Sequence, residues 1–138
     1  MARRVIALMG VPYINEDGVA AEAIKPGHLV SGVTSISLND GDPCSRTFAL
    51  ERDELGDDID EPYAIGDVVK VGSFTPGQRV YAWLASGQNV AAGAFLEPQT
   101  NGLLTAFGSG VRIARALEAV DASAPTDGVA SRIRVEVY

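Results

Sequence analysis

The chain has 138 residues, of which 46% are hydrophobic and 21% charged, and its formal net charge is −7. This composition is typical of one soluble globular domain with a hydrophobic core, and it excludes a disordered chain. The single cysteine, Cys44, excludes an internal disulfide and a cysteine-based zinc site, and no apolar run approaches the roughly 20 residues of a membrane span.

The negative charge is concentrated in one segment. Residues 51–67 contain eight acidic residues against one base, Arg52, and the rest of the chain is neutral. Such a segment repels nucleic-acid phosphates and anionic lipid headgroups, so we expect neither nucleic acid nor a membrane as a partner.

The N-terminal segment places Arg3 and Arg4 before a seven-residue apolar run. The run is short and lacks a small-residue cleavage site, so we interpret it as a mature N-terminal strand or arm and not as a signal peptide. For Val5–Met9 two interpretations stay open. The strand pairs within its own barrel, or it adds to the sheet edge of a neighbouring protein.

Short strands separated by turn signals fill most of the remaining chain, and no internal repeat stands out. The turn signals include NDGDP (39–43), TPG (75–77), SGQ (86–88) and TNG (100–102). This spacing predicts an all-β fold, a small barrel or sandwich. The predicted strands are Val5–Met9, Leu29–Leu38, Thr47–Glu51, Asp67–Gly72, Arg79–Leu84, Asn89–Leu96, Gly102–Ala106 and Arg132–Tyr138.

The stretch RVYAWL (79–84) alternates small or aliphatic residues with Arg79, Tyr81 and Trp83. Alternation of this kind predicts a half-buried strand. Tyr, Trp and Arg are the residue types enriched at interface hot spots, so the second face is either outer packing or a contact surface.

Two segments have an ambiguous pattern. Residues 18–24 (GVAAEAI) allow a short helix. In residues 111–120 the apolar residues Ile113, Leu117 and Val120 have helical spacing, and the residue types favour helix slightly over strand.

The candidate reactive residues do not assemble into a known site. His28 follows a glycine and precedes a strand, with no nucleophile elbow in the chain, so we interpret it as a surface histidine beside a turn. The acidic residues Asp57, Asp58, Asp60 and Glu61 lack the spacing of a calcium loop, and FGSGV (107–111) lacks the lysine of a phosphate loop.

A biotinyl or lipoyl carrier is excluded because Lys25 and Lys70 both lie outside the glycine-rich stretch 76–104. We therefore expect no enzyme activity, no cofactor and no metal, and hence no catalytic residues.

Five stretches resemble the capsid decoration (cement) proteins of tailed bacteriophages. The resemblance covers most of residues 25–138. The stretches are AIKPGHLV, EPYAIGDVVKV, PGQRVYAWLASGQNVAAGAFLEPQTNGLL, ARALEAVDASA and RIRVEVY.

The resemblance implies a β-barrel or β-tulip domain at residues 25–138 behind an extended N-terminal arm at residues 1–24, with residues 111–120 as strand. It also implies a structural virion protein on the outer capsid surface, bound to the major capsid protein and to copies of itself as a trimer or dimer. The interface candidates are Arg3, Arg4, Val5, Ile6, Arg79, Tyr81, Trp83 and Tyr138. The competing hypothesis is a soluble barrel that binds a small ligand or carbohydrate, in a pocket with converging polar groups.

Overall fold

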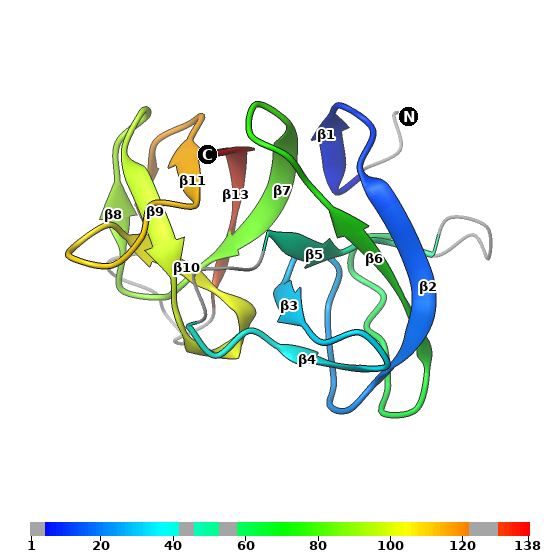
Figure 1. Ribbon diagram of the computed structural model, residues 1–138. Helices are drawn as coiled ribbons and strands as arrows, with labels where there is room; N and C mark the ends of the chain where they lie inside the picture. Colours follow the sequence, from blue (N-terminus) through cyan, green and yellow to red (C-terminus); the bar gives the residue numbers. More distant parts are fainter. Residues whose placement is uncertain (1–4, 42–45, 53–57, 122–129) are drawn as a thin grey trace.

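The structure is a computed structural model that describes residues 5–41, 46–52, 58–121 and 130–138. The described part is built from β-strands that form two five-stranded barrels side by side, with one short 3-10 turn, η2 (Thr100–Gly102), between two strands of the second barrel (Figure 1). The all-β prediction is confirmed. The single predicted barrel is in fact two.

The first barrel closes in the order β2-β4-β3-β5-β6. The β2–β4 pair is parallel and the other four pairs are antiparallel. Its strands are β2 (Tyr13–Ala20), β3 (Leu29–Ser31), β4 (Ser35–Leu38), β5 (Thr47–Ala49) and β6 (Val68–Ser73).

The second barrel closes in the order β7-β10-β9-β11-β13, because β13 pairs with β7. The short strand β1 pairs with β7 outside the ring, and β8 and β12 form a two-stranded ladder. The strands are β1 (Ala7–Met9), β7 (Arg79–Leu84), β8 (Asn89–Val90), β9 (Phe95–Pro98), β10 (Leu104–Ala106), β11 (Ala114–Ala116), β12 (Val120–Asp121) and β13 (Ser131–Val137).

The two barrels repeat one topology. In the second barrel only β7–β10 is parallel, and this pair takes the place that the parallel pair β2–β4 has in the first barrel. The register repeats as well, because Phe48 lies opposite Leu29 and Gly72 in the first barrel, and Arg115 lies opposite Phe95 and Glu136 in the second. We call residues at the same place in the two barrels counterparts.

Backbone hydrogen bonds outside the ladders repeat in the same way. The Leu50 N–H donates to the Lys70 carbonyl at 2.8 Å, and the Leu117 N–H donates to the Arg134 carbonyl at 2.9 Å. Both leucines stand in the sequence Ala-Leu-Glu, at residues 49–51 and 116–118. The chain therefore contains an internal repeat that the sequence reading missed.

Two apolar clusters hold the barrels together. One fills the inside of the first barrel with small and branched residues around Tyr63. The other contains the inner residues of the second barrel together with outward-facing residues of the first, such as Leu29 and Phe48. The second cluster thus joins the two barrels into one body.

The predicted N-terminal arm at residues 1–24 differs from what the structure shows where it is described. Ile6 is fully buried in the second cluster, β1 pairs with β7, and β2 is a full strand of the first barrel. Between the two interpretations of Val5–Met9, pairing within its own chain is the one observed for residues 7–9. Residues 1–4, including Arg3 and Arg4, lie outside the described residues.

The ambiguous segments both lack helix. Residues 18–24 continue β2 and then form an isolated bridge between Ile24 and Tyr63. In residues 111–120, β11 and the start of β12 confirm strand over the local helix preference. Pairing of β11 between β9 and β13 outweighs intrinsic propensity there.

Candidate interaction surfaces

The outer face of β7 carries three of the predicted interface residues. Its even-numbered residues are buried, and Arg79, Tyr81 and Trp83 lie on the outer face, each half-buried. The alternation predicted from the sequence is confirmed. The two ends of this face have different surroundings, however.

At one end, Trp83 lies at the contact between the two barrels. Its indole N–H donates to the Pro26 carbonyl at 3.0 Å. Arg132 lies over the indole ring at 4.0 Å from the centroid and donates to the carbonyls of Pro26 and Ile59, both at 2.8 Å. Trp83 and Arg132 thus bind the first barrel within the same chain.

Gly27 allows this close approach. A Cβ at this position would collide with Arg132 Nη1 and would lie 2.8 Å from the Tyr81 carbonyl oxygen, and the glycine has a φ of +97°. Only glycine combines that backbone conformation with the absence of a side chain. At Gly27 the turn conformation and the packing between the barrels therefore both favour glycine.

His28 closes the turn that Gly27 belongs to. Its Nδ1 accepts a hydrogen bond from the Lys25 N–H at 3.1 Å. The side chains of Asp67 and Gln78 make the same kind of contact, because each accepts a hydrogen bond from the backbone N–H three residues earlier, at 2.9 and 3.0 Å. Burial, followed by the charges of Lys25 and Arg132, lowers the pKa of His28 to about 4. His28 is therefore a half-buried, neutral turn residue, not the surface histidine that the sequence suggested.

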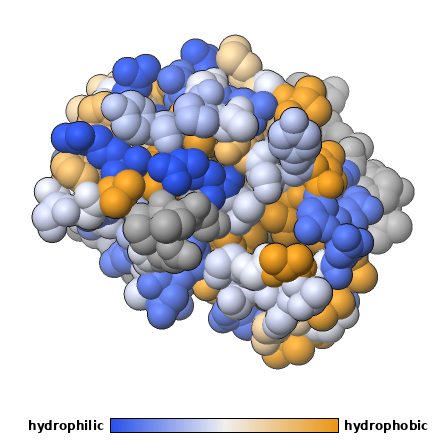
Figure 2. All heavy atoms as spheres, viewed as in Figure 1, coloured by the Kyte–Doolittle hydropathy of each residue, from blue (hydrophilic) through white to orange (hydrophobic). Residues whose placement is uncertain are grey.

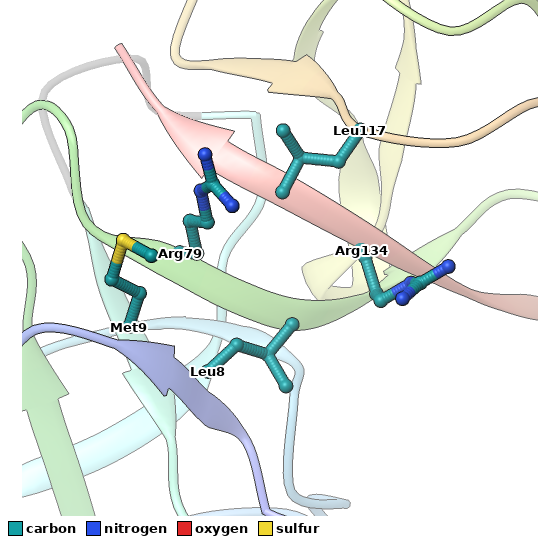
Figure 3. A pocket seen from close by; sticks show the side chains of 5 residues that line it. All are labelled: Leu8, Met9, Arg79, Leu117 and Arg134. Carbon is teal, nitrogen blue, oxygen red and sulfur yellow. The ribbon is translucent and has the colours of Figure 1, made fainter.

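At its other end, the outer face of β7 opens into a pocket of about 320 Å³ (Figure 3). Leu8 and Met9 from β1 and Leu117 supply apolar walls, and Arg79 and Arg134 stand at opposite sides of the view. Arg79 Nε lies 3.8 Å from Glu136, and this buried nitrogen has no hydrogen-bond partner within the described part of the chain.

Arg134 is held in place more firmly than Arg79. Its guanidinium donates to Glu118 at 3.1 Å, and its backbone N–H donates to the other carboxylate oxygen at 2.9 Å. The side-chain hydrogen bond lowers the pKa of Glu118 and raises that of Arg134. The pair fixes the loop that carries Leu117.

The chain from β1 through the connecting turn to the start of β2 exposes a run of apolar side chains, which we call the N-terminal ridge. The exposed fractions range from 38% at Leu8 to 86% at Val11. The ridge consists of Leu8, Met9, Val11, Tyr13 and Ile14. The neighbouring interface candidates differ, because Val5 is 36% exposed and Ile6 belongs to the core.

A second apolar surface, which we call the aliphatic tip, lies at the end of the first barrel away from the N-terminus. It consists of Val19, Val33, Ile65 and Val68, with Ile65 73% and Val33 69% exposed. Val19 and Val68 are cross-strand partners in β2 and β6. Figure 2 shows apolar surface over this lower part of the first barrel. The sequence reading missed the tip, although a branched aliphatic residue inside each of two turn stretches, SGVTS and AIGD, is a usable signal.

The acidic segment lies on the first barrel where it is described. Asp60 is 3.5 Å from Arg132, Asp67 is 3.6 Å from Arg52, and Asp58 accepts from the Ile59 N–H. Asp57, one of the four calcium candidates, lies outside the described residues. Among the residues that the structure describes, no three His, Cys, Asp or Glu side chains gather as metal ligands would.

No helix in the described ranges has the length and apolar character required to cross a membrane. No family model matches the chain, and no curated protein matches it either.

Proposed function

We propose that the chain is a structural virion protein that binds the outer surface of an assembled phage capsid and stabilises contacts between major capsid subunits. Its partners are the major capsid protein and further copies of itself, not nucleic acid, a membrane or a cofactor. The proposal includes no enzymatic step. The resemblance in five stretches supports it, and these stretches supply strands and turns of both barrels.

The N-terminal ridge is the observation that carries the proposal. Val11 and Tyr13 are 86% and 80% exposed, and they lie beside other exposed apolar residues in one short segment. Contiguous exposed apolar surface marks interaction sites, because leaving it hydrated costs free energy. The ridge joins β1 of the second barrel to β2 of the first, so a partner bound there contacts a firmly anchored segment.

Stabilisation of a capsid follows from linkage. A protein that binds the assembled lattice and not the separate subunits shifts the equilibrium toward the lattice. Each copy must contact at least two capsid subunits for this effect, so that separating them breaks contacts on both. Repetition over the lattice allows modest individual affinities to suffice.

Binding to undecorated capsids tests the proposal. The purified protein is mixed with them, and the bound copies are counted after sedimentation. We expect saturable binding, and we expect Val11→Ser with Tyr13→Ser to weaken it by about tenfold or more, as for residues central to an interface. Val111→Ser, an exposed valine outside the ridge at 45% exposure, is the matched control. Absence of binding by the wild-type protein, or equal binding by the ridge variant, contradicts the proposal.

A further inference from the structure

The contact between the two barrels uses one face of each, and each face has a counterpart on the other barrel. On the first barrel, the outward-facing apolar residues at the contact are buried to 5% exposure or less. These contact residues are Leu29, Phe48, Leu50 and Phe74. Their counterparts on the second barrel are Phe95, Arg115, Leu117 and Tyr138, and we call these four residues the counterpart strip.

In the described residues no barrel covers the counterpart strip, in which Arg115 and Tyr138 are exposed and Phe95 and Leu117 are half-buried. Each face contains an edge-to-face aromatic pair, Phe48 with Phe74 at 5.7 Å and Phe95 with Tyr138 at 5.0 Å, and the members Phe74 and Tyr138 are counterparts. Phe74 is 4% exposed, whereas Tyr138 is 54% exposed. Arg115 is also exposed, and Leu117 lines the open pocket of Figure 3.

The turns beside these faces show the same difference. A Cβ on Gly27 would collide with the second barrel, but a Cβ on its counterpart Gly93 would meet no atom within 4 Å. Both glycines donate their N–H to corresponding carbonyls, Ala49 at 2.7 Å and Ala116 at 2.8 Å. The second barrel therefore presents an uncovered version of the surface that the first barrel uses for contact.

The face by which the second barrel contacts the first also has a counterpart, which lies on the first barrel. Trp83 and Arg132, which are cross-strand partners, bind the first barrel from the second. Their counterparts are Val19 and Val68, which lie in the exposed aliphatic tip. η2 reaches the first barrel through a hydrogen bond from the Gly102 N–H to the Asn39 carbonyl, and the corresponding connection of the first barrel carries exposed Val33.

We propose that the aliphatic tip of one copy docks on the counterpart strip of a second copy, repeating between chains the contact that joins the barrels within a chain. The inference rests on the proposed function in one respect, because it assigns a surface to the self-association proposed there. A head-to-tail contact of this kind closes into a ring when the rotation between copies permits.

Charge favours this pairing over a contact between two like barrels. Residues 13–73 contain 13 acidic and four basic residues, and residues 76–138 contain five of each. Arg115 in the strip, together with Arg79 and Arg134 from the neighbouring strands, has a side chain 41–57% exposed. Asp67 follows Ile65 closely in the tip and has a side chain 40% exposed. Opposite charges across the contact raise the rate of association and disfavour the alternative pairing of two first barrels.

Sedimentation velocity between about 1 μM and about 1 mM protein measures self-association directly. We expect the wild-type protein to associate in this range and Ile65→Asp to raise the dissociation constant by at least about tenfold. Val11→Asp introduces the same charge at an exposed valine outside both faces, and it should leave association unchanged. A wild-type protein that stays monomeric, or an assembly that Ile65→Asp does not weaken, overturns the proposal.

Cysteine crosslinking tests the direction of the contact. The Arg132 guanidinium donates a hydrogen bond to the Pro26 carbonyl within the chain, so the counterparts Val68 and Ala92 should approach each other between chains. In a Cys44→Ser background, a mixture of Val68→Cys and Ala92→Cys chains should crosslink with a short bismaleimide. Neither chain alone should do so, nor should Val68→Cys mixed with Asp40→Cys. Crosslinking of Val68→Cys chains with themselves shows a symmetric contact and also overturns the proposal.

The two proposals fail separately. Capsid binding is measured with the ridge variants and self-association with the tip variants, since Val11 and Tyr13 belong to neither face of the copy-to-copy contact. An Ile65→Asp protein that has the far-ultraviolet circular dichroism of the wild type is folded, so its loss of association is then a surface effect.

Discussion

The two barrels share strand order and register but differ in the residues that face outward. At corresponding places the first barrel has Phe48, between β3 and β6, and the second has Arg115, between β9 and β13. Phe48 is 1% exposed because the second barrel covers it, whereas Arg115 faces solvent and lies 3.6 Å from Glu136. The inward-facing residues keep their apolar character in both barrels.

This comparison shows that the fold and the surroundings of each barrel are set by different residues. Inward-facing positions determine a closed five-stranded barrel, and outward-facing positions determine what covers it. Leu117 and Tyr138 are outward-facing residues of the second barrel that are nevertheless large and largely apolar, as expected for a face that a partner covers.

Replacing the two counterparts by alanine should give the largest difference between the barrels. We expect Phe48→Ala to lower the free energy of unfolding by about 3–5 kcal/mol, because it empties a well-packed position at the contact. Arg115→Ala should change it by less than about 1 kcal/mol, since an exposed ion pair contributes little. Urea denaturation of both variants measures the difference. Similar losses for the two variants would falsify the view that only the first barrel is covered on this face.

Much of the fold was predictable from the sequence, and the exceptions have physical causes. The alternation at residues 79–84 marks β7 because one face of that strand is buried. Strand β2 was missed because its first five residues are all exposed, which removes the alternation on which strand prediction depends.

The candidate surfaces were predictable only in part. Arg79, Tyr81 and Trp83 were found as one face, but the sequence does not reveal that Trp83 contacts the first barrel of its own chain. That contact depends on residues 57 and 106 positions apart, Pro26 with Trp83 and with Arg132. The repeat is not evident in the sequence because the outward-facing residues differ between the barrels, as Phe48 and Arg115 illustrate.

Alanine at the two counterpart glycines should give a difference of intermediate size. Both have a positive φ, +97° at Gly27 and +88° at Gly93, so both substitutions strain the backbone. Only Gly27→Ala also forces the barrels apart, and we expect it to cost about 1–3 kcal/mol more than Gly93→Ala. Thermal and urea unfolding of the pair measure the difference. Equal costs would show that the turn at Gly27 does not depend on the approach of Arg132 and Tyr81.

The smallest of the expected effects is a loss of folding stability at acid pH that comes from His28. His28 has a pKa of about 4 in the folded chain against 6.5 for the ordinary group, so between these values the unfolded chain binds a proton that the folded chain does not. The folded state therefore loses stability as the pH falls from 6.5 toward 4, and the loss is constant below pH 4. At pH 5 we expect this contribution to be about 1–2 kcal/mol. His28→Gln retains an acceptor for the Lys25 N–H, as Gln78 does for Thr75, and removes the titration. Urea unfolding at pH 7 and pH 5 should show a smaller loss for this variant than for the wild type. A histidine that remained open to solvent would instead give both proteins the same pH dependence, because its pKa would be alike in the folded and unfolded chains.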